Sequence, residues 1–464
     1  MKHPSEYWNE EVLVMGLAKS GVAAATLFHQ LGAQVIVNDY KQRDECPEAE
    51  QLEKLGICVI CGSHPEELVH KNVALIVKNP GIPYHITPIA RALELGIEIV
   101  SEVEVAYHMS LAPMIGITGS NGKTTTTTLI GLMLAAAGKS PIVAGNIGRA
   151  LTEAVSEARS DQWLVVELSS FQLKGTSQFR PRISLLLNLY ETHLDYHQSI
   201  EDYMASKARI FQNQTIADIA ILNADDSFCQ SMIPQVKAQI ALFSMKEELP
   251  IGVYLESQTQ MIVYRNSTGE RIPILSATDI GIPGAYNIEN AMAAISVALH
   301  VGVAPEIMSQ VLQDFRGVEH RLEYVRELDG VTFYNNSKAT NPAATIKSIE
   351  AFIQPLILIA GGLDRGSDYM ELLPIFESRI KGIVTIGQTS TKLRKVAERA
   401  GIQHIITIDG VGNSQDVIAR AVRAAQSLSV QGDIVLLSPA CASWDMFTSY
   451  EHRGSMFKDC VHNL

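Results

Sequence analysis

The residues best suited to chemistry lie between Gly116 and Thr125, in the run Gly-Ile-Thr-Gly-Ser-Asn-Gly-Lys-Thr-Thr. An apolar stretch that predicts a strand precedes this run, and a Thr- and Ala-rich helical stretch follows it. Glycines let backbone N–H groups crowd around a phosphate, and a helix N-terminus adds the positive end of its dipole. Lys123 can reach the outer phosphates of a nucleotide, and the Thr124 hydroxyl can ligate Mg²⁺. Ile117 stands where the strict G-x-x-x-x-G-K-[ST] pattern has its first glycine, so an ordinary Gly-rich turn is the alternative; the strand and the helix favour nucleotide binding.

Other polar residues follow buried strands of the same segment. Glu167 comes directly after the apolar stretch Trp163–Val166. A carboxylate at the carboxyl end of a parallel strand lies where ligands bind, and it suits Mg²⁺. Asn188 and His193 follow the next strand in the same way, although a lone histidine is more simply a hydrogen-bonded loop residue. Lys207, taken by itself, is typical of the solvated face of a helix.

The N-terminal segment carries an incomplete dinucleotide fingerprint. Gly16, Ala18 and Gly21 hold the G-x-G-x-x-G positions, with alanine at the second, and Asp39 lies near the distance expected for a ribose contact. A structural strand–turn–helix unit explains the pattern nearly as well. Because the phosphate loop lies elsewhere, we expect this segment to hold the nucleotide part of a substrate rather than a redox cofactor.

These residues need a framework, and strands alternate with helices along the whole chain. That alternation predicts an α/β fold with parallel sheets. We expect three consecutive α/β domains: a Rossmann-like N-terminal domain, a P-loop-type central ATPase domain and a Rossmann-like C-terminal domain, over residues 1–110, 111–316 and 317–464. The predicted strands are 12–15, 34–37, 57–61, 74–77, 97–100, 114–118, 163–166, 184–187, 219–222, 331–334, 356–360, 382–386, 404–407 and 433–437, and a helix is predicted at 287–300.

Composition narrows the function classes. The chain has 464 residues, of which 47% are hydrophobic, and its net charge of -13 is a poor footprint for nucleic acid or an anionic membrane. No apolar run approaches the roughly 18 residues that span a bilayer, and the first residues do not predict a signal peptide. We therefore expect a cytoplasmic protein, with no nucleic-acid or membrane partner. We read the Cys58–Cys61 pair, on a predicted buried strand, as small core residues rather than a redox or metal site.

Taken together, the motifs resemble those of the Mur ligases, the amino-acid-adding enzymes of peptidoglycan synthesis. The match runs through nearly the whole chain. The elements that carry it are Thr118–Thr125, Asn188–His193, Asn287–Ala291, His320–Glu323, Tyr334–Pro342 and Leu437–Asp445. The last two are most like those of the member that adds D-glutamate to UDP-N-acetylmuramoyl-L-alanine.

The resemblance implies roles for individual residues. ATP would be held by Gly119, Ser120, Asn121, Gly122, Lys123, Thr124, Thr125, Asn287, Asn290 and Arg321. Mg²⁺ would be held by Thr124, Glu167, His193 and Lys207, with Lys207 carbamylated into a carboxylate-like ligand. The substrates would contact Ala18, Asp39, Asn79, Gly81 and Asn146 for the UDP-sugar, and Thr340, Arg365, Ser443 and Tyr450 for D-glutamate. The resemblance further implies that Lys123, His193, Lys207 and Lys338 are catalytic.

Three positions depart from the family pattern. Asn336 stands where Asp is usual, Asn79 where Ser is usual, and Arg365 where some relatives carry Lys. The implied reaction is an ATP-dependent amide ligation through an acyl phosphate, by a protein expected to be a monomer. The alternatives are another Mur or folylpolyglutamate-type ligase and, in a different class, a nucleotide-gated binding protein that only hydrolyses ATP.

Overall fold

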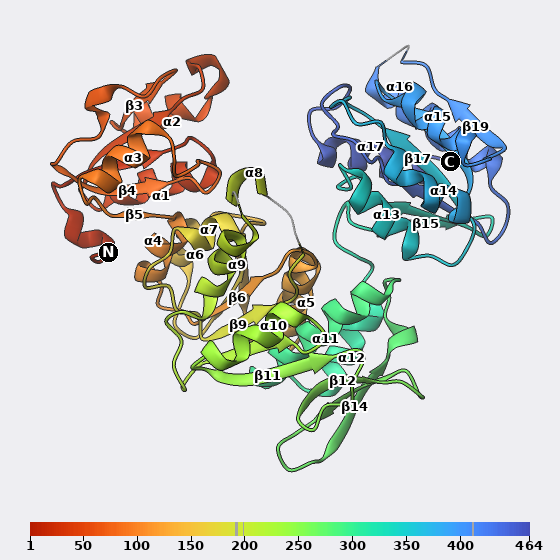
Figure 1. Ribbon diagram of the computed structural model, residues 1–464, viewed down its shortest axis with the longest axis horizontal. Helices are drawn as coiled ribbons and strands as arrows, with labels where there is room; N and C mark the ends of the chain where they lie inside the picture. The colour runs from red at the N-terminus through yellow and green to blue at the C-terminus, as the bar shows by residue number, and fades with distance from the viewer. Residues whose placement is uncertain (191–193, 198, 411–412) are drawn as a thin grey trace. The chain divides into compact units, whose positions relative to one another are not determined.

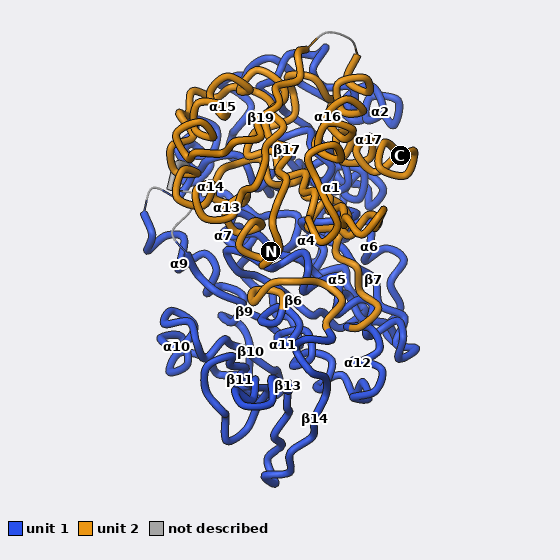
Figure 2. Tube along the Cα trace, turned by 90° about the vertical axis from the view of Figure 1, so that its right-hand side faces the viewer, with its two compact units in different colours: residues 1–279, 288–312 blue, residues 280–287, 313–464 orange. Residues whose placement is uncertain are grey.

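The computed structural model describes residues 1–190, 194–197, 199–410 and 413–464. The chain divides into two compact units (Figure 2). Unit 1 comprises Met1–Asp279 and Ile288–Leu312, and unit 2 comprises Ile280–Asn287 and Gln313–Leu464. In the described part of the chain, no helix combines the length and the apolar character needed to cross a membrane.

The N-terminal part of unit 1 is a parallel sheet of order β3-β2-β1-β4-β5 (Figure 1). Alternate residues of β1 enter two different cores, Val12 and Val14 on one face and Leu13 and Met15 on the other. Side chains alternate along a strand, so this sheet is covered on both faces. The strands are β1 Glu11–Met15, β2 Gln34–Asp39, β3 Cys58–Cys61, β4 Val73–Lys78 and β5 Ile99–Val100; the helices are α1 Lys19–Gln30, α2 Glu48–Lys54, α3 Thr87–Glu94 and α4 Glu102–Met109.

The central sheet has the order β14-β13-β12-β11-β10-β9-β6-β8-β7. Its strands are parallel from β7 to β12, whereas β12, β13 and β14 form an antiparallel meander. The strands are β6 Met114–Thr118, β7 Pro141–Gly145, β8 Trp163–Glu167, β9 Ile183–Leu186, β10 Ile219–Asn223, β11 Gln239–Ser244, β12 Gly252–Glu256, β13 Met261–Arg265 and β14 Arg271–Ser276. The helices of this region are α5 Lys123–Ala136, α6 Leu151–Glu157, α7 Ser170–Lys174, α8 Leu194–His197, α9 Ile200–Ala208, α10 Ser227–Met232, α11 Ala285–His300 and α12 Pro305–Asp314.

Unit 2 contains a sheet of order β15-β16-β20-β17-β18-β19, parallel except for β15. Helix α13 begins at Pro342, because Asn341 caps the Ala344 N–H and Pro342 suits the first helical position. The strands are β15 Glu323–Leu328, β16 Val331–Asn335, β17 Leu356–Gly361, β18 Ile380–Ile386, β19 His404–Thr407 and β20 Ile434–Leu437; the helices are α13 Pro342–Glu350, α14 Leu373–Arg379, α15 Ser390–Arg399, α16 Ser414–Leu428 and α17 Tyr450–His462. Short 3₁₀ helices occur at Pro4–Tyr7, Arg43–Glu45, Glu66–Leu68, Arg209–Phe211, Ile233–Gln235, Ala277–Asp279 and Met370–Leu372.

The predicted α/β fold with three sheets is confirmed, and each sheet lies within its expected residue range; the boundaries themselves stay a prediction. The sequence prediction missed β7, the strands β11–β14 and β15. It was also wrong about Cys58, which is exposed. The physical reason is that β3 is an edge strand: it pairs with β2 on one side, and no strand of its sheet lies on the other side.

Candidate active site

The phosphate loop has the backbone that its glycines predicted. Gly122 adopts φ +84° at the N-cap of α5, and a Cβ there would lie 2.1 Å from Asn290 Oδ1. Asn188 holds the other side of the loop, because its Oδ1 accepts from the Asn121 N–H at 3.0 Å and its carbonyl accepts from the Ser120 N–H at 3.0 Å. Asn188 and Asn290, distant in sequence, therefore meet at the loop.

Lys207 is buried beside this loop, with 1% of its surface exposed. Its Nζ donates to the Gly119 carbonyl at 2.8 Å and to Thr118 Oγ1 at 3.3 Å. Burial, reinforced by the charge of Lys123 and opposed by that of Glu167, lowers the pKa of Lys207 well below its usual value. The interpretation of Lys207 as a solvated surface residue was therefore wrong: helix α9 packs this face against α7 and the phosphate loop.

Lys123 directs its charge to the same place. Its Nζ donates to the carbonyls of Gly119 at 2.8 Å and Ser120 at 2.9 Å. Two lysine amines thus converge on the Gly119 carbonyl at the N-terminus of α5. This concentration of positive charge suits a phosphate group, in a chain whose overall charge is negative.

Glu167 supplies the negative charge opposite these amines. It is the last residue of β8, in register with Ile117 of β6, so its carboxylate lies at the mouth of the loop. Oε1 accepts from Asn146 Nδ2 at 2.8 Å, whereas Oε2 is buried without a hydrogen-bond partner among the described residues. An orphaned, buried carboxylate oxygen beside a phosphate loop fits a Mg²⁺ ligand, because Mg²⁺ takes oxygen donors.

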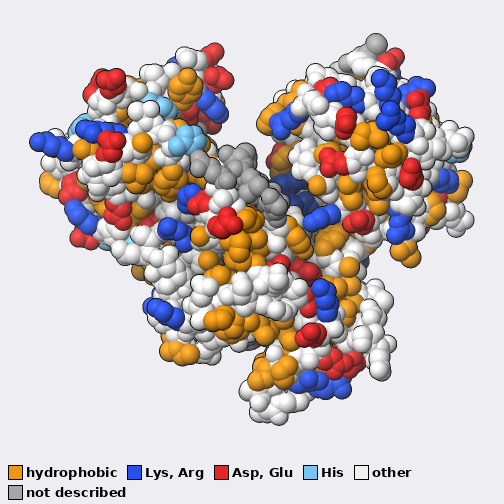
Figure 3. Space-filling view, in the orientation of Figure 1, with side chains coloured by type: hydrophobic (Ala, Val, Ile, Leu, Met, Phe, Trp, Pro, Cys, Tyr) orange, Lys and Arg blue, Asp and Glu red, His pale blue; other side chains and the backbone are white. Residues whose placement is uncertain are grey.

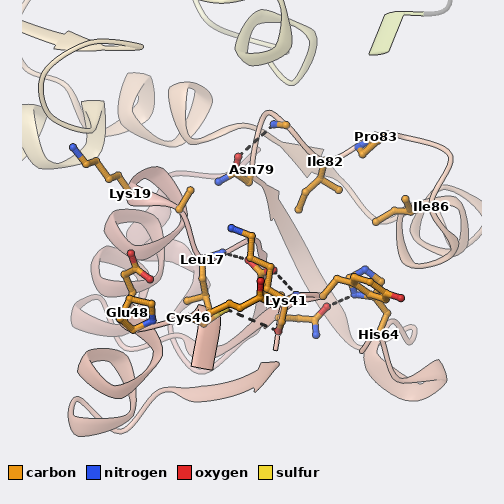
Figure 4. A pocket seen from close by; sticks show the side chains of 18 residues that line it. Leu17, Lys19, Lys41, Cys46, Glu48, His64, Asn79, Ile82, Pro83 and Ile86 are labelled. Atoms are coloured by element: carbon orange, nitrogen blue, oxygen red, sulfur yellow. Dashed lines mark hydrogen bonds between the residues drawn. The ribbon is translucent and has the colours of Figure 1, made fainter. Parts of the chain in front are cut away.

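A separate cavity of about 890 Å³ opens at the carboxyl ends of β1, β2 and β4 (Figure 4). It is lined in part by the predicted substrate residues Ala18, Asp39, Asn79 and Gly81. Asp39 holds the cavity wall, since its carboxylate accepts from the N–H groups of Leu17 at 2.7 Å and Lys41 at 2.9 Å.

Gly21, the third glycine of the fingerprint, lets α1 pack closely against the turn at Gly16 that lines this cavity. A Cβ on Gly21 would lie 2.0 Å from the Gly16 carbonyl oxygen, so only glycine permits this packing of α1 against the first turn.

Unit 2 brings together three of its predicted residues, Lys338, Thr340 and Tyr450. Lys338 Nζ donates to the Tyr450 hydroxyl at 2.9 Å, and the Thr340 N–H donates to the Lys338 carbonyl at 2.9 Å. Ser443 is buried. The residue after it, Trp444, lies beneath the exposed Arg365, whose Cζ is 5.3 Å from the centroid of the Trp444 ring.

Asn336, the departure from the usual Asp, has both ends of its amide engaged. Its Nδ2 donates to Ser438 Oγ at 3.2 Å, and its Oδ1 accepts from the Leu322 N–H at 3.2 Å. A carboxylate cannot make the donation to Ser438. The asparagine thus completes a neutral, buried hydrogen-bond network.

Sequence reasoning missed Arg453, which is fully buried on α17. Its guanidinium donates to Ser337 Oγ at 3.0 Å, to the Ser337 carbonyl at 2.8 Å and to the Cys441 carbonyl at 3.2 Å. It thereby joins the segment that carries Lys338 to the segment that carries Ser443. Burial lowers the pKa of Arg453 to about 10, so it stays charged at neutral pH. An arginine in the sequence Glu-His-Arg-Gly gives no local sign of this role.

The remaining predicted residues are distributed as follows. Asn287 and Asn290 are both buried on α11, and Asn287 Nδ2 donates to the Pro283 carbonyl at 2.5 Å. Arg321 follows His320, whose backbone has φ +64° and whose carbonyl accepts from the Lys338 N–H at 3.1 Å. His193 lies outside the residues that the structure describes.

Comparison with known proteins bears on these sites directly. Family models match over most of the chain: the Mur ligase MurD-like N-terminal domain over residues 10–101, the Mur ligase middle domain over 117–298, and the Mur ligase glutamate ligase domain over 320–441. The chain belongs to the Mur ligase family. The resemblance seen in the sequence motifs is thereby confirmed.

Full-length relatives and solved structures agree with this membership. The UDP-N-acetylmuramoylalanine--D-glutamate ligase of Geobacillus kaustophilus is 50% identical over 465 residues, and that of Bacillus mycoides is 47% identical over 464; both alignments cover 100% of each chain. MurF from Acinetobacter baumannii superposes with a TM-score of 0.60 at 18% identity, covering 97% of this chain and 93% of that one. The UDP-N-acetylmuramate-alanine ligase of Thermotoga maritima gives 0.58 at 16% identity, covering 98% and 99%. At these identities the structures show the shared Mur ligase fold.

Proposed function

We propose that this protein is an ATP-dependent ligase that joins D-glutamate to UDP-N-acetylmuramoyl-L-alanine in peptidoglycan synthesis. The observation that carries the proposal is the identity of about half the residues, from end to end, with ligases named for that reaction. In this proposal the phosphate loop is assigned to ATP, the cavity at the N-terminal sheet to the UDP-sugar, and the region around Lys338 and Tyr450 of unit 2 to the amino acid.

The chemistry requires activation of a carboxylate, whose leaving group would otherwise be oxide. A carboxylate oxygen of the UDP-sugar peptide attacks the γ-phosphorus of ATP, the bond to the bridging oxygen of ADP breaks, and an acyl phosphate forms. The amine of D-glutamate, as the free base, then attacks the acyl carbon. Phosphate leaves with its electron pair, and the nitrogen loses one proton as the amide forms.

The residues of unit 1 fit the first step. Lys123 must turn from the Gly119 and Ser120 carbonyls toward the phosphates, and the α5 N-terminus presents its dipole to them. Electrostatic stabilisation of this kind dominates phosphoryl transfer. Lys338 of unit 2 is assigned to the charge that develops on the acyl group in the second step.

Mg²⁺ would be held by Thr124, Glu167 and a carbamylated Lys207, and it would neutralise charge on the transferring phosphoryl group. The orphaned Glu167 Oε2 supports this assignment. The depressed pKa of Lys207 supports carbamylation, because only a neutral amine adds to CO₂. D-Glutamate is assigned to Thr340, Arg365, Ser443 and Tyr450, and the protein is proposed to act as a cytoplasmic monomer.

The decisive experiment incubates the purified chain with ATP, Mg²⁺ and UDP-N-acetylmuramoyl-L-alanine together with one amino acid at a time. We expect a product with one added D-glutamate by mass spectrometry, and none with L-glutamate, because inversion of the α-carbon misplaces the attacking amine. Incorporation of L-alanine or a diamino acid instead would reject the proposed substrate but keep the ligase class. Phosphate release that needs no amino acid, with no amide product, would favour the protein that only hydrolyses ATP.

A further inference from the structure

Lys78, which the reaction above does not use, is a buried lysine with neutral partners. It is the last residue of β4 and only 2% exposed. Its Nζ donates to the backbone carbonyls of Ile82 at 2.6 Å, Asn79 at 3.2 Å and Pro80 at 3.4 Å, and it lies 4.6 Å from the centroid of the Tyr84 ring. A charged group in such a place needs a structural reason, because its burial is costly.

The three carbonyls belong to the turn that forms one wall of the 890 Å³ cavity. Asn79, Gly81 and Ile82 line that cavity, and Figure 4 shows Asn79 and Ile82 directed to it. Asn79 is wedged against the first turn, since a Cβ on Gly16 would lie 2.7 Å from its own Cβ. Lys78 does not line the cavity itself. By donating hydrogen bonds to the three carbonyls on the far side of the turn, it fixes the conformation of the residues that do line it.

A fourth partner, Tyr196, connects this turn to helices α8 and α7. Lys78 Nζ donates to the Tyr196 hydroxyl at 3.2 Å, and that hydroxyl donates to the Ile82 carbonyl at 3.2 Å. The Tyr196 ring packs edge-on against Phe171, at 4.5 Å between centroids. Phe171 lies on α7, four residues after Glu167. The contacts therefore run from the wall of the cavity to the helix that follows the proposed metal-binding strand.

We propose that Lys78 is a positioning residue for the UDP-sugar: its ammonium group organises the Asn79–Ile82 turn and ties it to Tyr196. The proposal deepens the proposed function and rests on it, because it assumes that the cavity takes the UDP-sugar. Lys78 acts on that ligand only through the turn.

The hydrogen bonds that Lys78 donates to the turn and to Tyr196 are expected to depend on pH. Burial, followed by the charge of Lys174, lowers the pKa of Lys78 to about 7. An ammonium group offers three protons to its acceptors and a neutral amine only two, with a lone pair that repels the carbonyls. The turn should therefore loosen as the pH rises through about 7.

Other titratable groups face this site. They are Tyr84 and Tyr196, whose pKa values burial raises, Asp202 and His197, whose pKa values are lowered, and Lys174, which forms an ion pair with Asp202 at 2.7 Å. None of the tyrosine, aspartate or histidine shifts brings a charge change into the range above pH 7, so the expected loss belongs to Lys78.

The test is isothermal titration of UDP-N-acetylmuramoyl-L-alanine into the full chain at about pH 6 and about pH 8.5. In the wild-type protein we expect the dissociation constant to rise by roughly fivefold at the higher pH. In Lys78→Met it should be raised about tenfold at the lower pH, as expected for lost hydrogen bonds from a charged donor, and it should change little with pH. The Michaelis constant for ATP should not change. The control Lys71→Met removes an exposed lysine just before β4 and should behave as the wild type.

Wild-type affinity and pH dependence in Lys78→Met would overturn the inference. Tyr196→Phe provides a second route if Lys78→Met does not fold: it should bind the UDP-sugar severalfold more weakly yet keep the pH dependence. A flat wild-type profile together with unchanged binding by Tyr196→Phe would also overturn it. A wild-type protein that binds ATP but no UDP-sugar at either pH would instead reject the proposed function, and this inference with it.

Discussion

Single side chains near the phosphate loop owe their chemistry to burial. Lys123 and Lys207 both donate to the Gly119 carbonyl, but Lys207 is buried and its pKa is far lower than usual. A neutral amine is a nucleophile toward CO₂, whereas an exposed, protonated lysine is not. The same burial leaves Glu167 Oε2 without a hydrogen-bond partner in the described structure. The two residues are therefore complementary as prospective metal ligands.

At this scale we predict that Lys207 carries a carbamate. Protein incubated with ¹³C-bicarbonate should show a carbamate carbon signal by NMR, and Lys207→Ala should lack it. Lys207→Ala should lose activity by on the order of a hundredfold or more, because charge stabilisation at the phosphoryl group is lost, and short carboxylic acids should restore part of it. The exposed Lys237 serves as control, since Lys237→Ala should keep both the signal and the activity. An unchanged carbamate signal in Lys207→Ala would contradict the prediction.

At the scale of helices and strands, the start of α5 requires a glycine for two separate reasons. Gly122 needs a left-handed backbone, and it also needs space, because Asn290 of α11 occupies the position of a Cβ. Gly138, after the end of α5, has a similar backbone with φ +69°, but no atom lies within 4 Å of the place that a Cβ would take. Comparing Gly122 with Gly138 therefore separates the free-energy cost of backbone strain from that of steric crowding.

We predict different outcomes for alanine at these two positions. Gly138→Ala should lower the free energy of unfolding by about 1 kcal/mol, from left-handed strain alone, and leave ATP affinity unchanged. Gly122→Ala should displace Asn290 at an added cost of about 1–3 kcal/mol, and should weaken ATP binding by about tenfold or more. Denaturant unfolding and ATP titration measure the two effects. Equal stabilities and equal ATP affinities for the two variants would show that the contact with Asn290 does not matter.

On the scale of the whole molecule, most charged side chains lie on the surface, whereas a few buried carboxylates connect one helix to other segments. Acidic and basic side chains are interspersed over the face shown in Figure 3. Two carboxylates of α4, the helix after the first sheet, instead point into the central part of unit 1. Glu104 accepts from the N–H groups of Ser177, Gln178 and Phe179, and Glu102 accepts from Thr152 N at 2.5 Å and Oγ1 at 2.8 Å. Burial raises the pKa of Glu102 to about 7.

This raised pKa predicts the sign of a pH effect on stability. Between pH 4.5 and about pH 7, Glu102 binds more protons in the folded protein than in the unfolded chain. Its contribution to the free energy of unfolding therefore falls as the pH rises through that range. At about 1.4 kcal/mol per pKa unit, the loss is about 3 kcal/mol. Glu102→Gln removes the titration. The stability of this variant relative to the wild type should therefore rise by up to that amount between about pH 4.5 and about pH 7.5. Denaturant unfolding at both pH values measures it, and a constant difference would refute the assignment.

The sequence was sufficient for features that depend on neighbours close along the chain. Alternating strands and helices predicted the three α/β sheets, and Gly119–Thr125 predicted the phosphate loop, because backbone conformation and helix capping are decided within a few residues. The sequence prediction missed the meander β12–β14 because no helices separate its strands. The motif that contains Lys338 and the one that contains Ser443 were identified only through their resemblance to Mur ligase motifs.

The tertiary structure decided which side chains are buried and what they touch. Lys207 meets the Gly119 carbonyl 88 positions away, and Lys78 meets Tyr196 across 118 positions. Arg453 joins two segments that are separated by more than a hundred residues, at Ser337 and Cys441. None of these contacts leaves a local pattern, since a lysine or arginine on a strand end or helix is by default solvated. Desolvation, which sets their pKa values and their hydrogen bonding, exists only once the distant segments have packed around them.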